Sequence, residues 1–211
     1  MKTYLIRIYT KYFLFCFDYK RIMSKFVANF VFMSIINVKD KQFATFLRED
    51  EILKEIHRVA SDINNDMKGT DNVLFLCMLN GAFMFASDLM KKIDFPCEIS
   101  FVKFSSYSGT SSTGKVKEVV GLNTSIKGRT VIIVEDIVES GLTMKALLEN
   151  LRNKGAKELR VATMLLKPNK LEVDLKLDYV GFNIPDDFIV GYGLDYDGFG
   201  RNLSDIYTLV E

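Results

Sequence analysis

A single stretch of the sequence brings together residue types that bind sugars and phosphates. An apolar run of Val and Ile leads into Glu135 and Asp136, and Ser140, Gly141 and Thr143 follow a few residues later. Where a strand turns into a helix, free backbone N–H groups and the helix dipole favour a phosphate dianion, and two hydroxyls add to them. A glycine lets the backbone come close to such a ligand. The stretch therefore predicts a phosphate site beside two carboxylates.

The two carboxylates decide what kind of phosphate compound fits. Glu135 and Asp136 would repel a phosphate unless they meet hydrogen-bond donors or a cation, and ribose hydroxyls or Mg²⁺ would supply these. The stretch lacks the G-x-x-x-x-G-K-[ST] pattern of nucleoside triphosphate sites, because Leu142 stands where the lysine belongs. A sugar phosphate is thus favoured. The alternative, from residue types alone, is an acidic loop that only caps a helix.

Short apolar runs alternate with helical patterns over most of the chain. An apolar stripe between Ile52 and Met67 predicts a helix that ends near Gly69, and further helices are expected over 82–92 and 143–154. Runs rich in Val, Ile and Phe predict buried strands over 73–79, 99–104, 130–134, 159–166, 179–184 and 189–192. This order predicts an α/β fold with a mostly parallel twisted sheet and helices on both faces.

Ligands of such sheets bind beyond the carboxyl ends of the strands. Four segments of the sequence follow predicted strands at that edge, namely 79–81, 105–117, 135–143 and Lys167. We therefore expect these four segments to face one cleft, and any substrate to bind there.

These segments resemble those of the purine phosphoribosyltransferases, the hypoxanthine-guanine branch in particular. The similarity covers about residues 34–211, and its most specific pieces are VIIVEDIVESGLT at 131–143, YVGFNIPDDFIVGYGLDY at 179–196 and SSYSGTSSTG at 105–114. The resemblance implies the type I phosphoribosyltransferase fold, in which a small hood covers the cleft. It also implies a purine salvage enzyme that transfers a 5-phosphoribosyl group from phosphoribosyl pyrophosphate to N9 of hypoxanthine or guanine, giving IMP or GMP.

The resemblance assigns roles to the acidic pair and to the turn after it. Glu135 and Asp136 match the pair that holds the 2′ and 3′ hydroxyls of ribose, and Glu139 matches the group that accepts the N7 proton of the purine. The loop that cradles the 5′-phosphate begins at Glu139 and continues through Ser140, Gly141, Leu142 and Thr143.

On the side of the base, the resemblance implies three further contacts. Lys167 donates to the 6-oxo group, Phe188 stacks on the ring, and the backbone of Ile189 meets the N1/C2 edge. An ammonium group donates to an oxo group but cannot accept from an amino group, so hypoxanthine and guanine are the expected substrates and adenine is not. Without the resemblance, Phe188 would be read as an ordinary core residue under a turn.

On the side of the pyrophosphate, the resemblance implies a loop, an arginine and a metal ion. The loop contains Asn80 and Gly81, with a cis peptide bond between Leu79 and Asn80, and the arginine is Arg201. The metal ion is Mg²⁺, bound by Asp195 together with Glu135 and Asp136. Ser106 and Tyr107 belong to the mobile loop that closes over the reacting centre; the alternative reading of 105–114 is a plain surface linker.

The sequence departs from the family at two positions. Glu139 stands where the family usually has Asp, which puts the proton-accepting role in doubt because the side chain is one methylene longer. Asn80 stands where some relatives have a basic residue, which puts the contribution of that side chain in doubt.

Composition limits the remaining possibilities. His57 is the single histidine and the three cysteines are scattered, so a His-ligated metal centre, a zinc ribbon and a disulfide framework are not indicated, and a reducing, cytoplasmic location is expected. Residues 33–211 form the predicted phosphoribosyltransferase domain, and they carry 22 basic and 26 acidic side chains. Nucleic acid and membrane are therefore not expected partners. The resemblance implies a homodimer or homotetramer.

The first 32 residues differ from the rest in composition. They hold six basic residues against one acidic residue and are rich in aromatics, yet they contain no apolar run long enough to span a membrane. They are either a basic surface-binding appendage or residues upstream of the true start, with Met33 or Met23 as the initiator. The second interpretation is preferred because the segment lacks helical periodicity.

Two other functions remain open at the level of sequence. One is a nucleotide-sensing regulator that has the same fold and binds without reacting, which the Glu at position 139 would favour. The other is a transferase that acts on xanthine or on a pyrimidine. Lys167, Asp195 and Arg201 argue against a pure sensor, which would not need all three.

Overall fold

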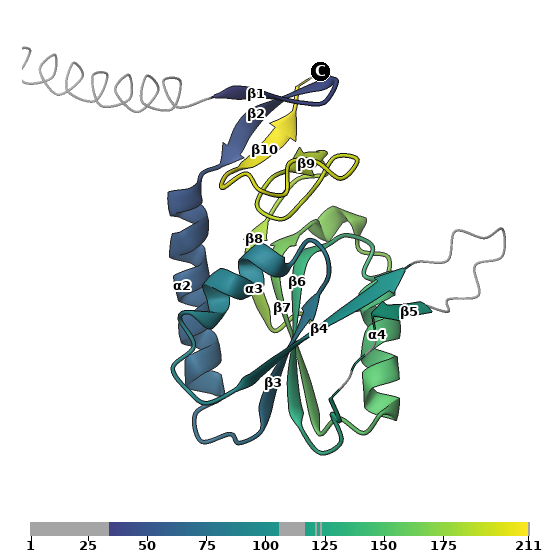
Figure 1. Ribbon diagram of the computed structural model, residues 1–211. Coiled ribbons are helices and arrows are strands. Elements are labelled where there is room, and N and C mark those ends of the chain that lie inside the picture. The colour runs from purple at the N-terminus through teal and green to yellow at the C-terminus, as the bar shows by residue number, and fades with distance from the viewer. Residues whose placement is uncertain (1–33, 106–116, 121, 123, 211) are drawn as a thin grey trace, which may run out of the picture.

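A computed structural model of the chain describes residues 34–105, 117–120, 122 and 124–210 (Figure 1). Its centre is a six-stranded sheet with the order β5-β4-β3-β6-β7-β8, in which five strands are parallel and β5 pairs antiparallel with β4. The strands are β3 (Val73–Met78), β4 (Glu98–Ser105), β5 (Lys117–Val120), β6 (Thr130–Val138), β7 (Glu158–Leu166) and β8 (Tyr179–Asn183). The predicted fold class is confirmed.

Helices cover both faces of this sheet. They are α2 (Glu49–Asp66), α3 (Phe83–Met90) and α4 (Leu142–Asn153), with a 3-10 turn, η1, at Pro168–Lys170. The connection from β3 through α3 to β4 and the one from β6 through α4 to β7 move in opposite directions along the sheet. Because both crossovers are right-handed, α3 and α4 lie on opposite faces, and α2 packs beside α3. All six residues of β3 are accordingly buried.

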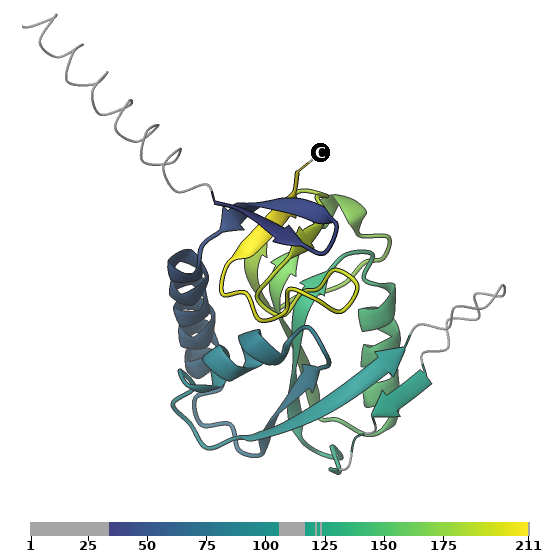
Figure 2. The same ribbon diagram turned by 45° about the horizontal axis from the view of Figure 1, so that its top comes forward.

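A second, smaller sheet forms the hood above the carboxyl end of the large one (Figure 2). It is antiparallel with the order β1-β2-β10-β9, and its strands are β1 (Ile35–Val38), β2 (Lys41–Leu47), β9 (Ile189–Val190) and β10 (Ile206–Leu209). The beginning and the end of the described chain therefore meet in one sheet, although more than 150 residues separate them. The hood places the segment around β9 above the cleft.

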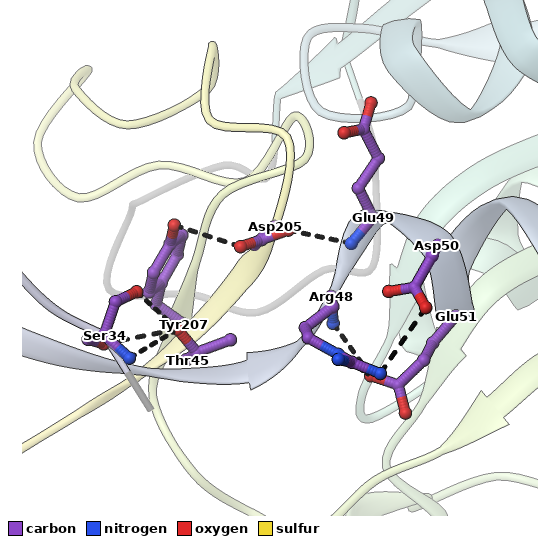
Figure 3. A network of polar contacts seen from close by, with 8 residues as sticks. All are labelled: Ser34, Thr45, Arg48, Glu49, Asp50, Glu51, Asp205 and Tyr207. Carbon is purple, nitrogen blue, oxygen red and sulfur yellow. Dashed lines mark hydrogen bonds and ion pairs between the residues drawn. The ribbon is translucent and has the colours of Figure 1, made fainter. Parts of the chain in front are cut away.

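Polar contacts fix the hood to the start of α2 (Figure 3). The backbone N–H of Glu49 donates to the Asp205 carboxylate at 2.7 Å, and the Tyr207 hydroxyl donates to the same carboxylate at 3.3 Å. The Arg48 N–H donates to the Glu51 side chain at 3.1 Å. An acidic group at a helix start satisfies free N–H groups and favours the dipole, so Asp205 of the hood acts as a tertiary cap for α2.

Two details differ from the sequence-based expectation. Strand β6 was expected to end at residue 134, but it continues to Val138 and includes Glu135 and Asp136, because Glu135, Ile137 and Val138 still pair with β7. The run 189–192 was expected in the parallel sheet, but Ile189 and Val190 pair with β10 in the hood. His57, the single histidine, lies exposed on α2.

Candidate functional site

A cavity of about 210 Å³ opens where β6 turns into α4. It is lined by Glu135, Ile137, Val138, Glu139, Ser140, Gly141, Thr143 and Met144. The predicted strand-to-helix turn therefore borders an open pocket. Its lining includes one of the two carboxylates, Glu135, together with Glu139 and the hydroxyl residues Ser140 and Thr143.

Both residues of the acidic pair are half-buried, and Glu135 lines the cavity. Burial, and after it the neighbouring Asp136 carboxylate, raise the pKa of Glu135 well above its usual range. Glu135 accepts a hydrogen bond from the Asp136 N–H at 3.2 Å, and Asp136 accepts one from the Ile137 N–H at 3.0 Å. Two adjacent acids in this setting favour hydroxyl donors or a cation as ligands.

The turn before α4 places a glycine directly at the start of the helix. Gly141 has a φ of 77°, a left-handed conformation that suits glycine, and it stands directly before Leu142, the first helical residue. Its Cα faces side chains of the 171–175 segment, where an added Cβ would lie 3.0 Å from Val173. The Ser140 carbonyl accepts from the Glu172 N–H at 3.0 Å, so the segment after β7 supports the turn from behind. Thr143 is exposed.

Lys167 is in direct contact with Glu139, which lines the cavity. The Lys167 Nζ donates to the Glu139 Oε1 at 2.5 Å; the side chain of Lys167 is 6% exposed and that of Glu139 is 45% exposed. A buried ammonium requires such a partner. Two further charges join the pair, Lys170 and Asp186, which are bonded to each other at 2.7 Å and which no local sequence pattern indicates. Lys170 Nζ is 4.0 Å from Glu139, and Lys167 Nζ is 3.8 Å from Asp186.

Phe188 lies on the hood side and is 47% exposed, so its interpretation as a core residue is wrong. Its ring contacts Tyr196 edge-on at 5.9 Å between centroids and Phe43 at 6.2 Å. One part of the ring is thus held by aromatic neighbours and another part is free to stack. The next residue, Ile189, is buried and pairs with Thr208 through its backbone.

The loop after β3 meets the hood loop that carries Asp195 and Arg201. The Leu79–Asn80 peptide bond is cis, as predicted. Arg201 donates from Nη1 to the Gly193 carbonyl at 2.7 Å and from Nη2 to Asp195 at 2.5 Å. An added Cβ on Gly193 would lie 2.0 Å from the carbonyl oxygen of Gly81, so the two loops are in close backbone contact.

An added Cβ on Gly81 would in turn lie 1.5 Å from the Asp136 Oδ2. This contact connects the loop after β3 to the acidic pair of β6. Together with the Lys167–Glu139 contact, it brings the predicted segments after β3, β6 and β7 to one edge of the sheet, as expected from the topology.

Residues 44–197 match the phosphoribosyl transferase domain family. The chain belongs to the phosphoribosyltransferase family. A relative named hypoxanthine-guanine phosphoribosyltransferase from Bacillus subtilis is 42% identical over 164 residues, which span 77% of this chain and 91% of the relative.

Solved phosphoribosyltransferase structures agree with this assignment. The hypoxanthine phosphoribosyltransferase of Staphylococcus aureus is 40% identical with a TM-score of 0.75, and the match covers 79% of this chain and 90% of that one. The hypoxanthine-guanine phosphoribosyltransferase of Bacillus anthracis, which holds a HEPES molecule in its active site, is 39% identical with a TM-score of 0.76 and is covered over its full length, against 82% of this chain.

Two predictions concern residues outside the part of the chain that the structure describes. Ser106 and Tyr107, assigned to the closing loop, lie outside the described residues, and so does the segment 1–32. Within the described part of the chain, no helix combines the length and the apolar character that crossing a membrane requires.

Proposed function

We propose that this phosphoribosyltransferase transfers the 5-phosphoribosyl group of phosphoribosyl pyrophosphate to N9 of hypoxanthine or guanine, which yields IMP or GMP and pyrophosphate in purine salvage. The observation that carries the proposal is the contact between buried Lys167 and Glu139, which lines the pocket between Glu135 and the start of α4. A hydrogen-bond donor and an acceptor for a base would thus lie beside a binding site for a sugar phosphate. The names of the relatives support the same activity.

The sugar phosphate would bind along β6 and its turn. Free N–H groups at the start of α4, the Ser140 and Thr143 hydroxyls and the close approach at Gly141 would hold the 5′-phosphate. Leu142 would contribute its backbone N–H, which donates to the Ser140 Oγ at 3.4 Å in the structure and would turn from it to the phosphate. Glu135 and Asp136 would accept hydrogen bonds from the ribose hydroxyls, which relieves the repulsion between the two acids.

The base would enter between Lys167 and Glu139. A 6-oxopurine protonated at N7 presents an acceptor next to a donor, and this order matches the ammonium of Lys167 and the carboxylate of Glu139. Phe188 would stack on the ring, and the backbone of Ile189 would meet the N1/C2 edge. A 6-amino group would leave buried Lys167 without an acceptor, which disfavours adenine.

The reaction breaks the bond between C1 and the pyrophosphate oxygen and forms the bond between C1 and N9. The leaving oxygen keeps the electron pair, and Arg201 would neutralise part of the resulting charge. The purine loses one proton, which Glu139 would accept at N7. Enclosure by the hood limits attack by water on the positively charged ribose.

A magnesium ion fits the residues present. Mg²⁺ is usually held by one or two carboxylates together with water and substrate phosphates, so the absence of a cluster of three ligands among the described residues is compatible with it. Asp195 would hold the ion, with Glu135 and Asp136 as further oxygen donors. When bound, Mg²⁺ would neutralise charge on the pyrophosphate.

The decisive experiment incubates the protein with phosphoribosyl pyrophosphate, Mg²⁺ and a panel of purine and pyrimidine bases while pyrophosphate release is followed. We expect turnover with hypoxanthine and guanine and none with adenine. Turnover restricted to xanthine or to a pyrimidine would replace the proposed substrate. Binding of nucleotides without any turnover would favour the regulator.

We further propose that residues 33–211 act as one transferase domain in the cytoplasm and assemble as a homodimer or homotetramer, without nucleic acid or membrane as partner. The exposed apolar side chains of Phe83, Ile99 and Phe101 support an assembly. Analytical ultracentrifugation of the full chain tests the number of subunits.

A further inference from the structure

A lysine of the neighbouring strand reaches the loop that follows β3. Strand β4 runs parallel beside β3, with Val102 opposite Met78, and the Leu79 N–H donates to the Val102 carbonyl at 2.8 Å. Lys103, one residue further along β4, is therefore level with the loop. Its Nζ donates to the Asn80 Oδ1 at 3.4 Å. A positive charge thus lies next to Asn80, whose own side chain is neutral.

The charges on the other side of this loop are already paired. Arg201 lies in the hood loop that touches the Gly81 carbonyl through Gly193, and its guanidinium is 2.5 Å from the Asp195 carboxylate. Lys103 differs from Arg201, because within the described part of the chain its ammonium contacts a neutral amide oxygen and forms no ion pair. A polyanion that binds over this loop can therefore contact the Lys103 ammonium without first breaking an ion pair between Lys103 and a carboxylate.

We propose that Lys103 is a pyrophosphate-binding residue, which holds the diphosphate of the donor substrate and of the product from the side of β4 while Arg201 does so from the hood. This inference rests on the proposed function. As the bond from C1 to the pyrophosphate oxygen breaks, the electron pair stays on that oxygen, and the ammonium of Lys103 offsets the charge that gathers there. Asn80 acts as a positioning residue, because its amide oxygen holds the Lys103 side chain over the loop.

The test compares Lys103→Ala with wild type in full steady-state kinetics and in calorimetric titrations of magnesium pyrophosphate. A lost charged hydrogen bond corresponds to a change of about 10- to 100-fold. We expect the KM for phosphoribosyl pyrophosphate and the Kd for pyrophosphate to rise within this range, while the KM for hypoxanthine stays within about twofold. Lys91→Ala is the matched control, because Lys91 is an exposed lysine of the same chain that pairs with Asp88.

A second variant separates binding from a structural effect. Adding Asn80→Lys to Lys103→Ala returns a positive charge to the loop, so we expect it to restore most of the affinity for pyrophosphate. Unchanged pyrophosphate affinity in Lys103→Ala, or a loss that Asn80→Lys does not restore, overturns the proposal.

The calorimetric titration uses no base. It therefore tests Lys103 even if the panel of bases assigns another substrate, and the two hypotheses can fail separately.

Discussion

The Lys167 ammonium lies 2.5 Å from the Glu139 carboxylate, so the donor and the acceptor proposed for the purine are bonded to each other in the free protein. Because Lys167 is buried whereas Glu139 is half-exposed, Glu139 is the partner that can move aside when a base arrives. A 6-oxopurine replaces one charged hydrogen bond by two. A base that cannot satisfy both groups leaves a buried charge without a partner.

Replacing Lys167 by Met is expected to remove the donor for the 6-oxo group. Loss of a charged hydrogen bond predicts a fall in kcat/KM for hypoxanthine of about 10- to 100-fold. The preference for hypoxanthine over adenine should narrow at the same time. Initial rates with both bases at saturating phosphoribosyl pyrophosphate measure the effect.

The control for this variant is Lys176→Met. Lys176 is also a lysine paired with an acid, Asp178, but its side chain is 80% exposed, and it should leave the rates unchanged. If Lys167→Met keeps the full preference against adenine, Lys167 does not select the base.

Replacing Glu139 by Gln keeps the size of the side chain but removes its ability to take a proton. A positioned carboxylate base contributes about 10²- to 10⁴-fold, so turnover should fall by a factor in this range. Glu139→Asp retains the carboxylate and should keep most of the activity. Single-turnover rates of the chemical step separate this effect from binding, and an unchanged rate in Glu139→Gln would remove Glu139 from the mechanism.

The acidic pair and the turn after it could be predicted from the sequence because their residues are contiguous. The central strands could be predicted because burial on both faces leaves continuous apolar runs, as in β3. The hood strands β1, β2 and β10 were not predicted. These strands are short, and β2 pairs with β10, which lies near the other end of the chain, so no local pattern indicates their pairing.

The contacts between distant residues could not be predicted either. Lys103 meets Asn80 across two strands, and Lys170 meets Asp186 across the segment that contains β8. Neither pair has a local pattern, because each depends on how separate elements are placed by the fold. The cis bond and the assigned base contacts were expected only through resemblance to the family.

Replacing Gly81 by Ala is expected to damage the donor site selectively. The added Cβ would lie 1.5 Å from the Asp136 Oδ2 and 2.4 Å from its Cγ, so either Asp136 or the loop must move. We expect the KM for phosphoribosyl pyrophosphate to rise by about tenfold or more, with a smaller change for hypoxanthine. Gly128→Ala is the control, because no atom lies within 4 Å of its added Cβ; its φ of 75° predicts a loss of stability of about 1 kcal/mol without a change in KM. Equal effects of the two variants would show that strain alone is responsible.

Replacing Glu135 by Gln is expected to change how stability depends on pH. The pKa of Glu135 is raised in the folded protein, first by burial and then by Asp136, from an ordinary value of 4.5. Between the ordinary and the raised pKa, the folded state therefore binds more protons than the unfolded state, and the free energy of unfolding falls as pH rises through this window. Gln cannot ionise and lacks this loss. Urea unfolding of both proteins at a series of pH values should show similar stability at or below pH 4.5, apart from a constant offset, and a growing advantage of Glu135→Gln as pH increases. A difference in unfolding free energy that does not vary with pH would mean that Glu135 ionises in the folded protein as it does in the unfolded chain.

The same variant should bind phosphoribosyl pyrophosphate more weakly, because the ribose hydroxyls lose a carboxylate acceptor.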